Sequence, residues 1–116
     1  MGMIKYGLDK LLVKSLKKKM KNLKEIQKIL AAHKEEMQKR YNLKEIGIFG
    51  SFARGEQNKT SDIDILVEFQ EVPDLLRFIE LERYFEDLLK MKVDLVRKFS
   101  VRSELKDIIL REVVEV

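Results

Sequence analysis

Two aspartates separated by a single residue, Asp62 and Asp64, have the types and spacing that point most directly to chemistry. They lie in an apolar, strand-like run, and side chains at i and i+2 of a strand point to the same face. Two carboxylates held side by side repel each other unless a cation lies between them. Magnesium prefers such oxygen ligands and often combines one or two carboxylates with substrate phosphates. The pair therefore predicts a metal site.

An isolated Asp-x-Asp pair more often marks a solvated strand end, so the metal interpretation depends on the surrounding sequence. Unpaired charge is costly in so apolar a strand. A third carboxylate, Asp94, lies in another strand-like run, from Lys92 to Val96. Upstream, Gly50-Ser51 ends the apolar run 46–49 and turns the chain into a short helical start, which directs backbone N–H groups at an anion such as phosphate. Together these features favour a metal site beside a phosphate-binding turn.

Length and composition exclude several other classes of protein. A chain of 116 residues is expected to form one domain, without room for a separate domain that grips a second substrate. The absence of cysteine excludes disulfides and thiolate chemistry. The single histidine, His33, has no second histidine or cysteine with which to form a zinc site, so we expect a packed residue. No apolar run is long enough to span a membrane and no signal-peptide core is present, so we expect a cytoplasmic protein.

The net charge of +4 is unevenly distributed along the chain. Residues 1–24 contain eight lysines and one aspartate, a net charge of +7, whereas the remainder has 16 basic and 19 acidic residues, a net charge of −3. We expect residues 1–21 to form a basic N-terminal helical extension and residues 22–116 to form the folded domain. A lysine cluster can attract nucleic acid. Because no aromatic residue adjoins the cluster Lys17-Lys18-Lys19, a solvated helix face is favoured and nucleic acid is not the expected partner.

The spacing of apolar residues predicts the elements that must position the carboxylates. Helical periodicity predicts one helix from residue 23 to about residues 40–42, and further helices over residues 73–90 and 102–111. Apolar runs predict strands over residues 44–49, 62–69 and 92–97, with a short edge strand over 113–116. Strands separated by helices predict an α/β (α+β) protein with a small mixed β-sheet and helices packed mainly on one face.

Individual residues are expected to set the ends and faces of these helices. Asn22 is expected to cap the first helix, and Pro73 is expected to lie in the first turn of the second. In the last helix, the apolar spacing predicts that Leu105, Ile108 and Ile109 face the core.

Three segments, taken together, carry a family resemblance: Gly50-Ser51-Phe52-Ala53-Arg54-Gly55, Ser61-Asp62-Ile63-Asp64-Ile65-Leu66-Val67 and Val93-Asp94-Leu95-Val96. They resemble the polymerase-beta-type nucleotidyltransferase superfamily. More narrowly, the chain is similar to the minimal nucleotidyltransferases of prokaryotes, which are often encoded beside a HEPN-domain partner as toxin–antitoxin pairs. The resemblance runs from about Leu23 to the C-terminus, so residues 22–116 would be the nucleotidyltransferase domain.

The resemblance implies roles for the matching residues. Gly50 and Ser51 would hold the phosphates of the nucleotide, and Asp62 and Asp64 would bind magnesium, with two ions expected. Asp94 would complete the metal site or act as the base that accepts a proton from the acceptor hydroxyl. Two alternatives stay open for Arg54, which would either contact a phosphate or lock the loop by pairing with a carboxylate. All the acidic positions of the motif are retained, so we expect an active enzyme.

The resemblance also implies a reaction and a partner. AMP would be transferred from ATP to a hydroxyl, that of a tyrosine, on a HEPN ribonuclease toxin, which this chain would silence as its antitoxin. The acceptor attacks the α-phosphorus and pyrophosphate leaves, while metal ions neutralise the charge on the phosphoryl oxygens. Two other classes stay open: a non-catalytic antitoxin that neutralises its partner by direct binding, and a nucleic-acid-binding protein that uses the lysine-rich arm.

Overall fold

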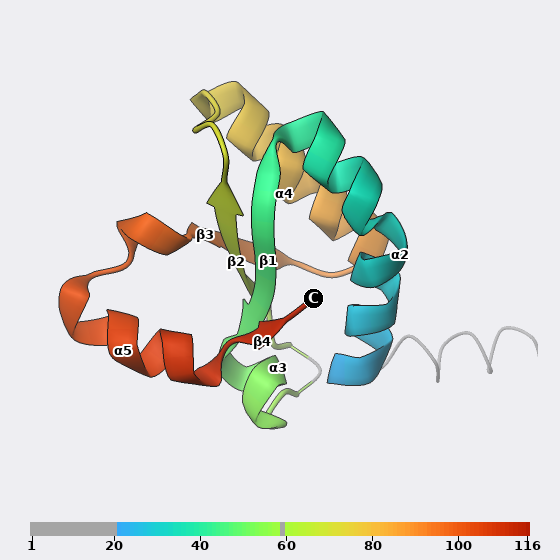
Figure 1. Ribbon diagram of the computed structural model, residues 1–116. Coiled ribbons are helices and arrows are strands. Elements are labelled where there is room, and N and C mark those ends of the chain that lie inside the picture. The colour runs from blue at the N-terminus through green and yellow to red at the C-terminus, as the bar shows by residue number, and fades with distance from the viewer. Residues whose placement is uncertain (1–20, 59) are drawn as a thin grey trace, which may run out of the picture.

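The computed structural model of the protein describes residues 21–58 and 60–116. It forms a four-stranded sheet in the order β3-β2-β1-β4, accompanied by helices. The elements, in chain order (Figure 1), are α2 (Leu23–Tyr41), β1 (Leu43–Phe49), α3 (Gly50–Arg54), β2 (Ile63–Phe69), α4 (Leu75–Leu89), β3 (Val93–Arg97), the 3-10 helix η1 (Lys98–Ser100), α5 (Ser103–Glu112) and β4 (Val114–Glu115). The predicted fold class and the short edge strand are confirmed. The predicted basic extension, apart from Lys21, lies outside the described residues.

The pairing of the strands makes the sheet mixed, as predicted. β1 runs antiparallel to β2 and β4, whereas β2 and β3 run parallel. The register pairs Asp64 with Phe49 on one side and with Asp94 on the other. The end of β1, the start of β2 and the start of β3 therefore meet at one end of the sheet.

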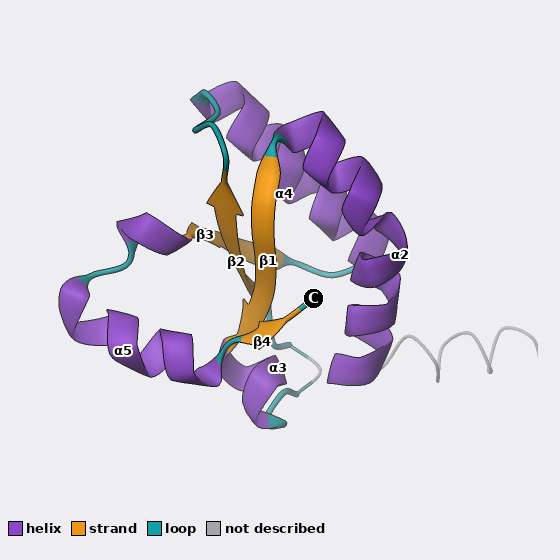
Figure 2. Cartoon of the chain, in the orientation of Figure 1, coloured by secondary structure: helices purple, strands orange, loops and turns teal. Residues whose placement is uncertain are grey.

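The hydrophobic core lies between the sheet and helices α2 and α4, which cover the same face (Figure 2). Buried residues alternate along the strands because successive side chains point to opposite faces. The core residues that define this face are Ile46, Ile48, Ile63, Ile65, Val67, Val93 and Leu95 from the strands, with Ile26, Leu30 and Met37 from α2 and Leu81, Phe85 and Leu89 from α4.

The other face of the sheet carries the intervening residues of β2 and β3. These are Asp64, Leu66 and Glu68 on β2 and Asp94 and Val96 on β3, and we call this face the carboxylate face. Neither α2 nor α4 covers this face, so Asp64 and Asp94 are left accessible on it.

Helix α5 lies away from α2 and α4, on the other side of the sheet (Figure 1). The prediction that its apolar residues face the core is wrong, because Leu105 and Ile108 are 47% and 51% exposed and Ile109 is only half-buried. The chain has to travel from β3 at one edge of the sheet to β4 at the other. α5 makes that crossing without a second layer of helices against which to bury its apolar side chains.

The N-termini of two helices are fixed by side-chain caps. Asn22 caps α2 as predicted, since its Oδ1 accepts a hydrogen bond of 2.9 Å from the N–H of Glu25. At α4 the cap is Asp74, whose Oδ1 accepts a 2.8 Å hydrogen bond from the N–H of Arg77. Pro73 therefore precedes the cap, and the prediction that it lies in the first helical turn is wrong, because the aspartate side chain satisfies a free N–H that a proline cannot.

His33 is half-buried on α2, and its Nδ1–H donates a 2.9 Å hydrogen bond to the carbonyl oxygen of Ile29 in the same helix. Within residues 21–58 and 60–116, no helix is both long enough and apolar enough to cross a membrane.

Replacing Asn22 by alanine is expected to lower the free energy of unfolding by about 1 kcal/mol, because an N–H of the first turn of α2 loses its acceptor. Urea unfolding monitored by circular dichroism measures the change. Asn22→Ser, which keeps a capping oxygen, is the matched control and should lie close to wild type. Equal stability of the two variants would show that the cap contributes nothing.

Candidate active site

Asp64 is the centre of the candidate site, and the register of the sheet explains its position. It is half-buried at the start of β2, directly beside Asp94 on the parallel strand β3. Asp62, which the sequence predicted as the first residue of this strand, is exposed and lies one residue before β2, so that boundary of the prediction is wrong. The structure thus brings Asp64 and Asp94 side by side, with Asp62 at the entrance to the strand.

The electrostatics of Asp64 reflect this crowding. Burial raises the pKa of its carboxyl group, and the charges of Asp94 and Asp62 and a hydrogen bond with Asp94 raise it further, to about 6. The charge of Arg54 acts in the opposite direction but is the weakest of these influences. Asp64 is therefore a carboxylate that lacks sufficient positive charge around it, as the spacing of the two aspartates predicted.

Gly50 lies directly against this carboxylate. Its φ of +72° is in the left-handed region that favours glycine. A Cβ added at this position would collide with Oδ2 of Asp64. The sequence predicted a phosphate-binding turn at Gly50-Ser51, and in the structure the group that Gly50 approaches is the Asp64 side chain. The turn at Gly50-Ser51 and the carboxylates therefore form one continuous site.

Arg54 is held by two carboxylates. Its Nε donates a 3.0 Å hydrogen bond to Glu56, and its Nη1 lies 3.1 Å from both carboxylate oxygens of Glu112. These contacts raise the pKa of Arg54. Of the two alternatives for Arg54, pairing with a carboxylate is the one present in this structure. No sequence signal connects Glu112 to this site, because it lies 58 residues away, at the end of α5.

The three aspartates are a suitable set of oxygen donors but not a finished metal site. Among the described residues, no group of three or more histidine, aspartate or glutamate side chains is gathered closely enough to hold a metal ion. Asp64 and Asp94 already adjoin each other, and Asp62 is near enough to raise the pKa of Asp64. For all three carboxylates to bind one ion between Asp64 and Asp94, the exposed Asp62 side chain would have to turn towards that ion.

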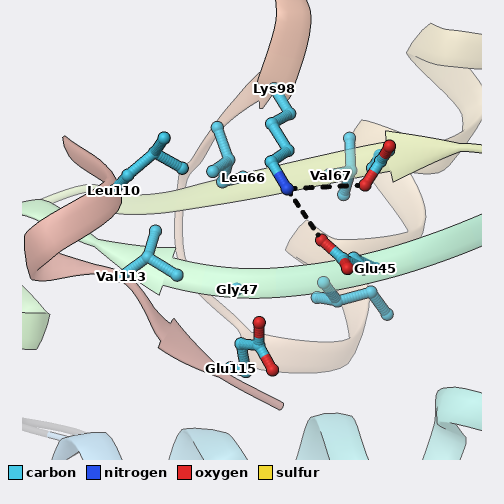
Figure 3. A pocket seen from close by; sticks show the side chains of 10 residues that line it. Glu45, Gly47, Leu66, Val67, Lys98, Leu110, Val113 and Glu115 are labelled. Carbon is cyan, nitrogen blue, oxygen red and sulfur yellow. Dashed lines mark hydrogen bonds and ion pairs between the residues drawn. The ribbon is translucent and has the colours of Figure 1, made fainter. Parts of the chain in front are cut away.

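A small cavity lies further along the carboxylate face, where the end of α5 approaches the sheet (Figure 3). Gly47 and Leu66 form part of its floor, and Leu110 and Val113 lie over it. Its volume of about 90 Å³ is enough for about three water molecules and too small for a nucleoside.

The cavity adjoins an ion network that the sequence analysis missed. Lys98 Nζ lies 3.1 Å from Glu45 and 3.6 Å from Glu68 (Figure 3). The hydrogen bond that Lys98 donates to Glu45 raises the pKa of Lys98 and lowers the pKa of Glu45. Glu68 lies four residues after Asp64 in the same strand, so the period of two that identified the aspartates also predicts Glu68 on the same face. Lys98 lies just after β3, in η1, where the strand period no longer applies.

Comparison with known proteins identifies the family. Residues 30–116 match the family model of the nucleotidyltransferase domain. Over 97 residues, the chain is 55% identical to the protein adenylyltransferase MntA of Thermococcus cleftensis, and the match covers 84% of this chain and 98% of that protein.

Solved structures show the same fold. A crystal structure of a toxin–antitoxin with AMP-PNP matches with a TM-score of 0.61 and 27% identity, over 72% of this chain and 69% of the other. A second match, to the structure of tri-AMPylated Shewanella oneidensis HEPN toxin in complex with MNT antitoxin, has a TM-score of 0.58 and 23% identity, over 78% of this chain and 70% of the other. Because the family model covers most of the chain and the MntA relative is more than half identical to it, this protein belongs to the nucleotidyltransferase domain family.

Proposed function

We propose that this chain is a magnesium-dependent protein adenylyltransferase. It transfers AMP from ATP to a hydroxyl, that of a tyrosine, on a HEPN-domain partner and thereby acts as an antitoxin. The observation that carries the proposal is the junction of the Gly50-Ser51 turn with Asp64 and Asp94 at one end of the sheet. The close similarity to MntA and the fold shared with a toxin–antitoxin that contains AMP-PNP support the same reaction.

The donor set fits magnesium as the metal. Carboxylate oxygens are its preferred protein ligands, and a cation would relieve the repulsion that raises the pKa of Asp64. Asp62 and Asp64 are the proposed ligands of two ions, and Asp94 is either a further ligand or the base. When bound, magnesium supplies positive charge that neutralises the phosphoryl oxygens of the nucleotide.

The chain's own groups would then position the two substrates. Backbone N–H groups of Gly50 and Ser51 would hold phosphate oxygens. The acceptor oxygen forms a bond to the α-phosphorus, the bond from that phosphorus to the pyrophosphate oxygen breaks, and pyrophosphate leaves with the electron pair. If Asp94 is the base, it takes the proton of the hydroxyl. Arg54 is exposed, so a phosphate can compete with Glu112 for its guanidinium.

The partner and the compartment follow from the proposed reaction. The chain has about the size of MntA, since the match covers 98% of that relative. The described residues form one small sheet with its helices, which favours an acceptor that contributes much of its own binding surface. A HEPN-domain protein encoded beside this chain fits that requirement, and the use of ATP as donor places the reaction in the cytoplasm.

Label from α-phosphate-labelled ATP is expected to appear on the HEPN-domain partner in the presence of magnesium. Asp64→Asn and Asp94→Asn should each reduce the rate at least about a hundredfold, because each removes a charge that acts on the transferred group. Labelled partner separated on a denaturing gel measures the rate. Chelation of magnesium should abolish the label.

Asp87→Asn is the matched control, because Asp87 is an exposed aspartate on α4, away from the carboxylate face. It should label the partner at the wild-type rate. If the aspartate variants still silence the toxin and no wild-type label appears, the protein neutralises its partner by contact and the proposed activity is wrong.

Asp64→Asn is also expected to stabilise the metal-free protein at pH 7. The rise in pKa from 3.8 to about 6 corresponds to about 3 kcal/mol, which solvent screening at this half-buried group reduces to about 1 kcal/mol. Because the folded-state pKa exceeds the unfolded value, the penalty is absent below about pH 4, grows up to about pH 6 and is complete above that.

Urea unfolding of wild type and Asp64→Asn in EDTA, at pH 4 and pH 7, measures this difference. Wild type should be the less stable protein at pH 7 only, and added magnesium should reduce the difference in free energy of unfolding between the two proteins. A difference of equal size at both values of pH would contradict the charge-based explanation.

A further inference from the structure

The edge of the sheet formed by β3 has an exposed apolar surface beside it. Leu75 and Leu76 at the start of α4 are 73% and 74% exposed, and Phe99 in η1 is 69% exposed. A groove of about 480 Å³ lies between the start of α4 and β3, and its walls include Leu75 of α4 and Leu95 and Arg97 of β3. Its volume is within the range of binding sites, and apolar surface of this kind commonly marks an interaction site.

The backbone of β3 is open along the same edge. Among the described residues, β2 is the only strand that pairs with β3 (Figure 1). The N–H of Val93 donates a 3.2 Å hydrogen bond to the Glu86 side chain, so the backbone of Val93 faces away from β2. Backbone groups alternate along a strand, and Leu95 and Arg97 therefore present their hydrogen-bonding groups on the same open side. Such an edge is a template for another strand.

The open edge leads directly to the candidate active site. An extended segment laid along β3 would lie about 4.8 Å from it, and its side chains would alternate between the two faces of the sheet. A residue opposite Leu95 would point into the groove beside α4. A residue opposite Asp94 would point to the carboxylate face, with its Cβ about 5 Å from that of Asp94.

We propose that the open edge of β3, together with the groove, binds an extended segment of the partner protein and presents the acceptor hydroxyl beside Asp94. The inference rests on the proposed function and specifies the acceptor: a hydroxyl residue in an extended segment, separated by an odd number of positions from an apolar residue that enters the groove. Backbone hydrogen bonds give such a segment its affinity and the groove gives it specificity.

The charge around the edge disfavours two other occupants. Arg97 and Asp74 line the groove, and Lys92 and Arg102 flank the strand in the sequence, so basic residues predominate there. Residues 1–20 contain six lysines and one aspartate, so this arm would be repelled. A second copy that paired its own β3 there would bring the basic ends of the two strands together and would fill the space beside Asp94 that the acceptor needs.

The test uses the full chain with a HEPN-domain protein as the proposed partner. Leu75→Glu/Leu76→Glu places charge beside the groove at exposed positions, and it should raise the KM for the partner about tenfold or more, with the KM for ATP close to wild type. Leu105→Glu/Ile108→Glu is the matched control, because it makes the same change at exposed leucine and isoleucine positions on α5. It should leave both KM values unchanged.

A second pair of variants tests the backbone. Arg97 has a φ of −79°, which proline accepts. Arg97→Pro removes the side chain and the N–H, whereas Arg97→Ala removes the side chain alone. Arg97→Pro should raise the KM for the partner severalfold beyond the effect of Arg97→Ala. In hydrogen exchange, the amides of Leu95 and Arg97 should be slowed by the partner, and those of α5 should not.

The outcomes separate this inference from the proposed function. Label transfer by wild type with unchanged KM in both sets of variants, and with no protection of Leu95, would overturn the inference alone. A wild type that neither labels nor binds the partner would overturn the proposed function and the inference with it. Protection of Leu95 without partner, accompanied by dimer formation or lost on deletion of residues 1–20, would identify a second copy or the arm as the occupant and overturn the inference.

Discussion

The register of two parallel strands holds the carboxylates of Asp64 and Asp94 next to each other, and the hydrophobic core prevents them from separating. Ile63 and Ile65 flank Asp64 in β2 and are fully buried under α2 and α4. A shift of one residue would bury the carboxylate and expose both isoleucines. The fold therefore imposes the repulsion between the aspartates, and binding of a cation or protonation of one carboxylate relieves it.

This constraint explains the asymmetry of the protein. Both long helices pack on the face that buries the isoleucines, which leaves the carboxylate face open to substrates. Helix α5 lies on that side and approaches the sheet through its C-terminal end, where Glu112 holds Arg54 and Val113 lies over Gly47. A tightly packed α5 would close the site, and its exposed apolar residues are the consequence of keeping it accessible.

Sequence periodicity was sufficient to predict the elements and the face that carries the aspartates. The period of two placed Asp64 on the face opposite Ile63 and Ile65, whereas Asp94 was assigned a role in the same site only through the family resemblance, because periodicity does not reveal which strands are neighbours. Helical periodicity was misleading at α5, because Leu105 and Ile108 have the spacing of a core stripe but no layer to pack against. Arg54 and Glu112 could not be paired from the sequence, since their contact depends on how α5 returns across the sheet.

The most direct test of this account is the pKa of the Asp64 carboxyl group, measured by carbon-13 NMR during a pH titration with and without magnesium and a non-hydrolysable ATP analogue. Without metal, the carboxyl should titrate near pH 6, as the crowding with Asp94 and Asp62 requires. With metal and nucleotide bound, it should stay ionised to below pH 4. A pKa near 4 under both conditions would mean that the aspartates do not form the charged site on which the proposed reaction depends.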